Sequence, residues 1–320
     1  MKFLCCLLLL IPLSLTAQVT LIPDTRFELY LVNEGIDTDG IVNGQVLTSD
    51  IADETILNIE EFGIEDLTGI EDFASLEFLD LFRMNISQID ISQNTNLRRL
   101  KLDDLPLESL DVSNNSNLTN LNISLDRTSG LYTSPLSSLD VSSNLLLERI
   151  GIYGTVISEI DVSINSNLVQ FELHLMQELT RVYLKNGANE QISFLRIIDN
   201  PNLQCVEVDD PASVIAGTAP PYNNWIISGN PIITDDCSLG VEEYLRSQIS
   251  ISPNPVKFHI TINATNRLEI ENIGLFDIQG RLVMTPNSFS LIDLSGLKQG
   301  IYLVAIETNK GVLTLKVIKN

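Results

Sequence analysis

The sequence is short of histidine, tryptophan and basic residues, and each shortage narrows what the protein does. Its 320 residues include two histidines and one tryptophan, and 19 Lys and Arg stand against 42 Asp and Glu. The net charge of −23 excludes nucleic acid and anionic membrane surfaces as partners, because both need a basic footprint. From Asp50 to Asp80 there are eleven acids and no base, which favours a solvated acidic cap over a surface that binds cations or a basic partner.

The common catalytic patterns are also missing. The sequence contains no HExxH, phosphate loop, dinucleotide fingerprint or Ser/His/Asp order. His174 and His259 stand alone, which favours surface residues over catalytic ones. The many acids leave a glycosidase carboxylate pair open, but many of them fall in repeated columns, as decoration of a scaffold would. We therefore predict a protein that is not an enzyme, with a polysaccharide-active enzyme as the least favoured alternative.

The N-terminus has the layout of a secretory signal peptide. Lys2 supplies positive charge, residues 3–10 are an unbroken apolar run, and Ala17 is a small residue at the expected cleavage position. A transmembrane anchor is the alternative, but the run is short and Pro12 interrupts it. We expect removal of residues 1–17, export, and no insertion into the membrane afterwards.

Two cysteines remain outside that segment, Cys205 and Cys237. An even count in an exported chain favours a disulfide, which would close a loop of about 33 residues and stabilise the fold by about 3–4 kcal/mol. A free reactive thiol is the alternative, and no surrounding motif supplies the activating partner that it needs.

The middle of the chain is a repeat, and the repeat predicts the fold. A triplet LxxLxL followed by LxxLDVSxN recurs five times, with starts 21 residues apart except that the third unit has eight extra residues. Within each triplet the last two apolar residues flank one outward residue, as in a strand. One turn cannot bury its own leucines, so the turns must stack. The unit starts are Leu76, Leu97, Leu118, Leu147 and Leu168.

The fold class predicted is therefore mainly β: a leucine-rich-repeat solenoid over residues 76–208, with two triplets per turn. Residues 18–75 would form the N-terminal cap and residues 209–237 the C-terminal cap with the disulfide, since a solenoid needs its apolar ends covered. Residues 238–248 would be a linker. Residues 249–320 contain about seven short alternating strands with glycine turns, which predict a small Ig-like β-sandwich.

Three polar columns support the stacking. Asparagines of one column should turn inward to satisfy backbone groups, and serines form a second column. The aspartates of the third column lie between apolar residues, so they should point outward about 4.8 Å apart, where repulsion invites cations or hydroxyls. Water-screened acids are the favoured interpretation, and a cation column is the alternative. The columns are Asn94, Asn115, Asn144 and Asn165; Ser92, Ser113, Ser142 and Ser163; and Asp90, Asp111, Asp140 and Asp161.

The outward residues of the first triplets differ from repeat to repeat, whereas the Asp column and the Ser column each keep one residue type. Repetition is typical of scaffold, and variety with aromatics and arginine is typical of recognition, so we predict that this face binds a partner; a neutral surface is the alternative. The predicted binding residues are Phe82, Arg98, Arg99, Lys101, Tyr153, Glu172 and His174, with Tyr132 from the insertion in the third unit.

We predict no cofactor and no resident metal. Asp37-Thr38-Asp39-Gly40 shares the start of a calcium loop, but position 48 is threonine where an EF-hand needs an acid. A turn is the favoured interpretation, and a structural calcium ion is the alternative.

Two stretches resemble known families. The first resemblance is to exported leucine-rich-repeat proteins of Bacteroidetes-type bacteria. It is carried by Ile22-Pro23-Asp24, Gly35 to Gly40, the LDVSxN repeats and Cys205 to Asp210. The C-terminal part resembles the type A C-terminal sorting domain of the type IX (Por) secretion system. The matching segments are Ile251 to Val256, Leu275 to Val283, Ile292 to Leu297, Gly300 to Val304 and Lys316 to Lys319. The resemblance implies recognition by that machinery at the outer membrane, frequent removal of the domain, and a passenger that is released or attached to the surface.

Together these observations predict a secreted or surface-attached binding or adhesion protein that recognises a protein or glycan. The alternative is a structural or adaptor-like surface protein without a soluble ligand.

Overall fold

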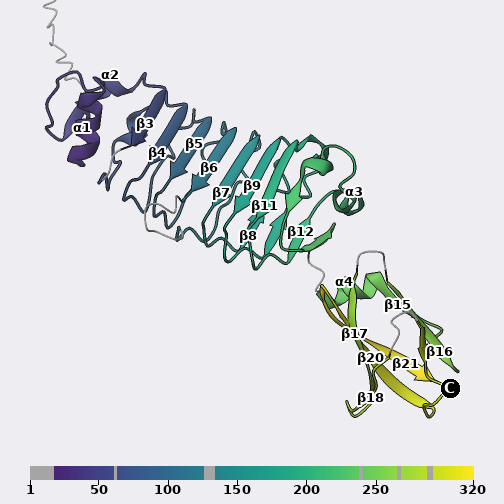
Figure 1. The fold of residues 1–320 in the computed structure, drawn as a ribbon. Coiled ribbons are helices and arrows are strands. Elements are labelled where there is room, and N and C mark those ends of the chain that lie inside the picture. The colour runs from purple at the N-terminus through teal and green to yellow at the C-terminus, as the bar shows by residue number, and fades with distance from the viewer. Residues whose placement is uncertain (1–17, 61–62, 126–133, 238–240, 265–267, 287–290) are drawn as a thin grey trace, which may run out of the picture. The chain divides into compact units, whose positions relative to one another are not determined.

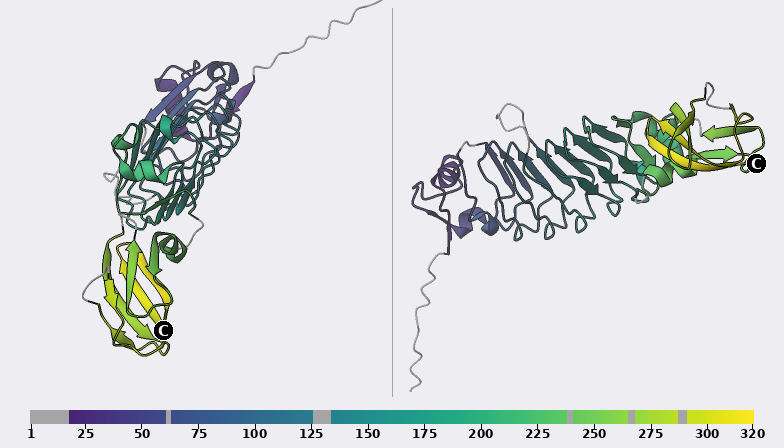
Figure 2. Two further views of the ribbon diagram at one scale, coloured as in Figure 1. Left: turned by 90° about the vertical axis from the view of Figure 1, so that its right-hand side faces the viewer. Right: turned by 90° about the horizontal axis from the view of Figure 1, so that it is seen from below.

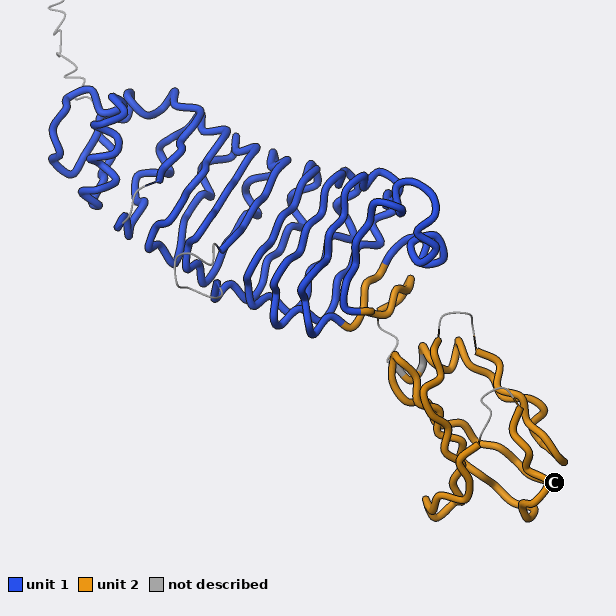
Figure 3. Tube along the Cα trace, viewed as in Figure 1, with its two compact units in different colours: residues 1–203, 208–229 blue, residues 204–207, 230–320 orange. Residues whose placement is uncertain are grey.

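The computed structural model describes residues 18–60, 63–125, 134–237, 241–264, 268–286 and 291–320. The chain divides into two compact units, residues 1–203 with 208–229 and residues 204–207 with 230–320, and each is described by itself (Figure 3).

The first unit is built on one parallel sheet of eight strands, which lie side by side in Figures 1 and 2. Neighbours in the sheet follow chain order from β3 to β13, except that β8, β10 and β12 belong to another sheet. The strands are β3 (Ile56–Glu60), β4 (Phe78–Phe82), β5 (Arg99–Asp103), β6 (Asn120–Ser124), β7 (Arg149–Tyr153), β9 (Gln170–His174), β11 (Phe194–Ile198) and β13 (Ile226–Ile227). The predicted repeat solenoid, mainly β, is confirmed.

The strand register reproduces the repeat of the sequence. Leu79 pairs with Leu100 and Leu100 with Leu121, 21 residues apart in each case (79, 100 and 121), and Leu121 pairs with Ile150 across the insertion. These four residues are at most 2% exposed, so the repeated leucines form the continuous core that a single turn cannot make. β3 precedes the first repeat and lies in the segment predicted as a cap.

Asparagines hold the turns together. After Asn94, which donates to the Ile70 and Phe73 carbonyls, each side-chain amide of the column donates to the backbone carbonyl of the preceding asparagine: Asn115 to Asn94 at 2.9 Å, Asn144 to Asn115 at 2.9 Å and Asn165 to Asn144 at 2.9 Å. Asn186, which the repeat pattern missed, continues the column by donating to Asn165 at 3.0 Å. The four asparagines predicted to point inward are all 0% exposed, so that prediction is confirmed.

The second triplets form strands in only some turns, which corrects the expectation of two strands per turn. β8 (Glu159–Asp161) pairs in parallel with β10 (Arg181–Tyr183), and β12 (Cys205–Glu207) pairs in parallel with β14 (Ile232–Thr234). In the first three repeats the second triplet has no strand hydrogen bonding and ends in a turn. Its apolar residues are still directed inward, since Ile86, Leu107 and Leu136 are fully buried.

The N-terminal segment packs two helices beside a two-stranded antiparallel sheet of β1 (Val19–Leu21) and β2 (Gln45–Leu47). The helices are α1 (Thr25–Asn33) and α2 (Thr48–Ile51), followed by the 3₁₀ turn η1 (Ile70–Asp72). Asp24 caps α1 by accepting from the Arg26 and Phe27 amides, and its second oxygen accepts from Glu65 and Asp66. Burial alone would raise the pKa of Asp24, but these four donors together lower it.

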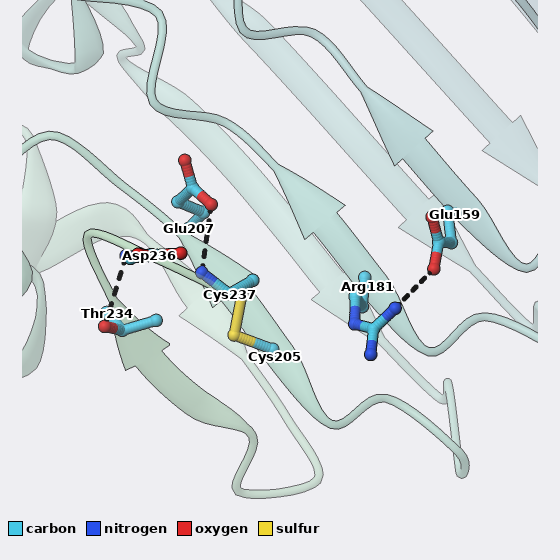
Figure 4. The surroundings of a disulfide bond; sticks show 7 residues. All are labelled: Glu159, Arg181, Cys205, Glu207, Thr234, Asp236 and Cys237. Carbon is cyan, nitrogen blue, oxygen red and sulfur yellow. Dashed lines mark hydrogen bonds and ion pairs between the residues drawn. A yellow bond between two sulfur atoms is a disulfide. The ribbon is translucent and has the colours of Figure 1, made fainter. Parts of the chain in front are cut away.

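The predicted disulfide is present. Cys205 in β12 is bonded to Cys237, with Cα atoms 6.0 Å apart, and the Cys237 amide donates to Glu207 at 3.0 Å (Figure 4). The helix α3 (Pro211–Ala216) and the 3₁₀ turns η3 (Asn189–Gln191) and η4 (Tyr222–Asn224) complete the end of the solenoid. Trp225 follows η4, and its indole N–H donates to the Ile192 carbonyl at 2.8 Å.

The C-terminal part contains two antiparallel sheets, as the sandwich prediction requires, of order β15-β16-β19 and β18-β17-β20-β21. Residues 241–248, predicted as part of a linker, instead form helix α4 (Val241–Gln248), whose Leu245 is fully buried in the core of these sheets. The segment forms a helix although its composition is polar, because its apolar residues are spaced so that they lie on one face. The strands are β15 (Ile249–Ser252), β16 (His259–Ala264), β17 (Ile270–Asp277), β18 (Leu282–Met284), β19 (Leu291–Asp293), β20 (Gly300–Thr308) and β21 (Gly311–Lys319).

Candidate functional site

The outward residues of the eight-stranded sheet, here called the sheet face, form three columns. The register places Asp80, Lys101, Asn122, Gly151 and Glu172 side by side in the middle column. Phe78, Arg99, Asn120, Arg149 and Gln170 form the column toward the strand starts, and Phe82, Asp103, Ser124, Tyr153 and His174 lie toward the strand ends. None of these columns consists of a single residue type, unlike the aspartate and serine columns.

The basic residues predicted to bind a partner are paired with acids on the same face. Arg99 Nε lies 3.0 Å from Asp80 Oδ1, and its guanidinium lies 4.9 Å from the Phe78 ring centroid. Arg98 Nε lies 3.4 Å from the Glu77 carboxylate just before the strand. The Arg98–Glu77 pair is exposed and contributes little to stability, so Arg98 can change partners at small cost, whereas the largely buried Asp80 holds Arg99 more firmly.

Lys101 is held in a similar way. Its Nζ lies 2.7 Å from Asp103 Oδ2 and 4.4 Å from the ring centroid of Phe82. The hydroxyl of Ser124 donates to the other oxygen of Asp103 at 2.6 Å. The structure therefore brings the predicted residues Phe82 and Lys101 together on neighbouring strands.

Tyr153, Glu172 and His174 form a second cluster. The Tyr153 hydroxyl donates to Glu172 Oε2 at 3.0 Å, and the Tyr153 and His174 rings lie 5.0 Å apart. Burial lowers the pKa of His174 while Glu172 acts in the opposite direction, and burial followed by the Glu172 hydrogen bond raises the pKa of Tyr153. His174 is packed against the Tyr153 ring with 17% of its side chain exposed, so this outward residue is only partly open to water.

Two hollows lie on the sheet face. A hollow of about 630 Å³ lies at the strand ends, and the predicted residues Phe82, Lys101 and Tyr153 line it together with Asp104 and others. A second, of about 230 Å³, lies over the middle of the sheet. Gly151 opens that space, because a Cβ there would lie 2.7 Å from Asn122 Nδ2 and 3.0 Å from the Tyr153 ring.

Sequence reasoning missed several residues of the larger hollow, above all Asp104. It follows β5 directly, is 6% exposed, and adopts a left-handed backbone with φ 62°. Arg83 and Leu175 line the same hollow and have φ of 55° and 58°. The only signal in the sequence is position, since each residue follows the last outward residue of a predicted strand. Tyr132 lies outside the described residues.

Each aspartate of the exposed column accepts a hydrogen bond within its own turn. Asp90, Asp111, Asp140 and Asp161 are exposed as predicted, and each accepts from the backbone N–H of the serine two residues later at 2.8–2.9 Å. Bonds from the Ser92 backbone and side chain lower the pKa of Asp90, and the hydroxyl and amide of the matching serine do the same for Asp111 and Asp140. The serine column therefore compensates the charge locally.

The Asp37 to Gly40 segment is a turn. Asp37 accepts from the Asp39 amide at 3.3 Å, and Asp39 accepts from the Ile41 amide at 2.7 Å. Burial, followed by the neighbouring acids, raises the pKa of Asp37. Over the described ranges, no three His, Cys, Asp or Glu side chains are grouped so that they could hold a metal ion.

The C-terminal sheets have a family match. Residues 250–320 match the family described as "Secretion system C-terminal sorting domain". The chain ends in a Por-type sorting domain. The protein is therefore exported through the type IX secretion system and is secreted or held at the cell surface. Of the helices in the described part of the chain, none has the length and apolar character needed to cross a membrane.

Comparison with solved structures finds internalins of Listeria monocytogenes. The functional domain of InlJ, whose description notes a cysteine ladder, is 16% identical with a TM-score of 0.43, covering 96% of this chain and 100% of that one. The internalin inlF is 12% identical (TM-score 0.36, covering 68% and 96%), and InlP is 14% identical (TM-score 0.35, covering 93% and 99%). No curated protein matches the chain.

Proposed function

We propose that this exported protein is a binding or adhesion module that recognises a protein or glycan partner through the sheet face. One observation carries the proposal: the outward columns of the eight-stranded sheet vary from strand to strand, while the aspartate and serine columns repeat the same self-compensating turn. A scaffold needs only the repeated turns. A varied face with arginines, aromatics and two hollows has the composition of a recognition surface.

The charges of the face support the same function. Arg98, Arg99 and Lys101 are paired with acids through contacts that remain partly open to water. Such pairs guide a partner into register and exchange with its charges more readily than they stabilise the free fold. We infer binding and not catalysis from the cluster of Tyr153, Glu172 and His174, because burial and the Glu172 hydrogen bond raise the pKa of Tyr153 and so keep its hydroxyl protonated and weakly nucleophilic.

The test is a binding screen with a matched pair of variants. The mature chain is applied to a glycan array and to an array of surface-protein peptides, in the wild-type form and as the triple variant Arg98→Ala, Arg99→Ala and Tyr153→Ala. The control is Arg181→Ala with Tyr183→Ala, which removes the same residue types from β10. We expect the triple variant to lose binding at least tenfold and the control to retain it.

Two results would contradict the proposal. Equal binding by the triple variant and the wild type would place recognition elsewhere on the chain. A wild-type protein that binds nothing on either array, while the purified chain is folded, would favour the structural or adaptor-like alternative.

A further inference from the structure

The larger hollow of the sheet face contains a buried carboxylate oxygen that has no hydrogen-bond partner among the residues that the structure describes. Asp104 lines this hollow, named here the Asp104 hollow, and its side chain is almost completely buried. Among the described residues, none donates a hydrogen bond to Asp104 Oδ1. An isolated buried carboxylate is costly, and native folds normally pair it.

The two basic residues of the hollow are already paired with other acids. Arg83 Nη1 lies 3.1 Å from Glu60 Oε1, and Lys101 Nζ lies 2.7 Å from Asp103 Oδ2. Taken together, the five charges of Glu60, Arg83, Lys101, Asp103 and Asp104 sum to −1, and that excess resides on Asp104. The hollow therefore needs one more positive charge.

The backbone fixes the position of Asp104 at the end of β5. Its φ of 62° lies in the left-handed region, and its amide is fixed by a 2.7 Å hydrogen bond to the Ser124 carbonyl. Leu175, on the same wall, has a φ of 58°, although leucine disfavours this region strongly. The same conformation recurs after β11 at Asp199, outside the hollow, so it belongs to the repeated turn, and its effect here is to fix the position of Asp104.

We propose that the Asp104 hollow binds a cationic side chain, the guanidinium of Arg or the ammonium of Lys, presented by a protein partner. This inference rests on the proposed function and names the chemical group that the sheet face recognises. A cation in the hollow beside Asp104 would supply the missing positive charge.

A neutral glycan fits less well. Its hydroxyls would satisfy the Asp104 oxygen as an acceptor but would leave the charge uncompensated. The two aromatic walls add a preference for cations, since Phe82 already holds Lys101 in this way, 4.4 Å from its ring. The net charge of −23 also attracts basic partners to the protein as a whole.

The structure offers a matched pair of variants. Asp104→Asn keeps the size of the side chain and the tolerance for a left-handed backbone, and it removes the negative charge. Asp199→Asn is the control, because Asp199 has a φ of 57° at the equivalent position after β11 but is exposed and does not line the hollow. Both variants change the net charge by the same amount, so a non-specific electrostatic effect would weaken both equally.

The probes are blocked peptides with one central Arg or Lys, compared with identical peptides that carry citrulline or acetyl-lysine. Binding is measured on an array and confirmed by calorimetry with the mature chain at 0.15 M salt. We expect the wild type and Asp199→Asn to bind the charged peptides, and Asp104→Asn to bind them at least tenfold more weakly. None of the three proteins should bind the peptides that carry citrulline or acetyl-lysine.

Three outcomes would overturn the proposal. Equal loss in both variants would show attraction by the acidic protein as a whole, and no peptide binding by the wild type would remove the cationic ligand. A neutral glycan that loses binding in Asp104→Asn alone would assign the hollow to a carbohydrate. In that case the proposal that the sheet face binds a partner would stand. That proposal would itself be contradicted if the triple variant of Arg98, Arg99 and Tyr153 bound as well as the wild type.

Discussion

The hydroxyl of Tyr153 in β7 donates a 3.0 Å hydrogen bond to the carboxylate of Glu172 in β9, the next strand of the same sheet. Gly151 makes this contact accessible, because it leaves the middle column empty under the tyrosine ring, where an added Cβ would lie only 3.0 Å away. The pair links the two hollows of the sheet face, since Tyr153 lines one and Glu172 lines the other.

Removing this bond should cost a modest amount of stability. We expect a coupling free energy of about 1 kcal/mol between Tyr153→Phe and Glu172→Gln, because both groups are partly buried and the acceptor is charged. Urea unfolding of the two single variants and the double variant gives this value directly. A coupling indistinguishable from zero would mean that water replaces the contact without loss. Tyr183→Phe, on β10, serves as the control for loss of a phenol elsewhere.

His174 should make the solenoid less stable in mild acid. Burial lowers its pKa in the folded state, so the unfolded chain binds the proton more tightly. Its contribution is therefore neutral above the unfolded pKa of about 6.5 and becomes destabilising as the pH falls below that value. The groups that face it are Tyr153 and the acids Glu172 and Asp199, which oppose the shift, and Arg196, which reinforces it.

The measurement is the unfolding free energy in urea at pH 7.5 and at pH 5.0. We expect the loss between the two pH values to be smaller in His174→Gln than in the wild type. His259→Gln provides the comparison, since that histidine is half exposed in β16. An identical loss in the wild type and His174→Gln would contradict the effect of burial.

The asparagine column should carry much more stability than its exposed counterpart. Asn144 is fully buried and donates at 2.9 Å to the carbonyls of both Val112 and Asn115. Asn144→Ala removes two hydrogen bonds inside the core, although each carbonyl keeps one backbone donor, from the Asn115 or the Leu118 amide, so we expect a cost of about 1–3 kcal/mol. Asn117→Ala removes a 2.9 Å bond to the Thr95 carbonyl at an exposed position and should cost under about 1 kcal/mol. Chemical denaturation of the two variants tests this order, and equal losses would contradict it.

The disulfide between Cys205 and Cys237 closes the end of the solenoid over a separation of 32 residues. Replacing both cysteines with serine should lower the unfolding free energy by about 3–4 kcal/mol, because the unfolded chain regains the entropy of the open loop. The wild type measured in reductant should match the double variant. A double variant as stable as the oxidised wild type would show that packing alone, with the Glu207 contact to the Cys237 amide, holds this end.

The sequence predicts the solenoid well because its information is repeated. Leu79, Leu100 and Leu121 occupy the same place in each turn, and stacking that buries one of them buries them all. β3 has the same pattern, with Leu57 and Ile59 fully buried, and it was missed because the turn that follows it departs from the repeat. α4 was missed because its one fully buried contact, Leu245, depends on strands far along the chain.

The candidate site is predicted only in part, for a physical reason. Phe82, Lys101 and Tyr153 are outward residues of strands, so their alternation predicts that they share a face. Asp104 adjoins Asp103 in the sequence, yet one is paired and the other buried and unpaired. That difference arises from a left-handed backbone at one residue and from partners on neighbouring turns, and no local pattern encodes either.

The position of α4 narrows the range in which the C-terminus of the exported, processed chain is expected. The resemblance to type IX cargo implies removal of the sorting domain, and the sequence alone allows an end anywhere from Cys237 to Ile251. Leu245 is fully buried with residues of the sorting-domain sheets, so a cut within α4 would have to break that core. We therefore expect the chain recovered from the medium or the outer surface to end between Cys237 and Val241. Intact-mass measurement decides the point, with Leu245→Glu as the comparison, since a loosened helix should allow cuts further along the chain. A wild-type species that ends beyond Gln248 would show that α4 stays with the passenger and would place the boundary after the helix.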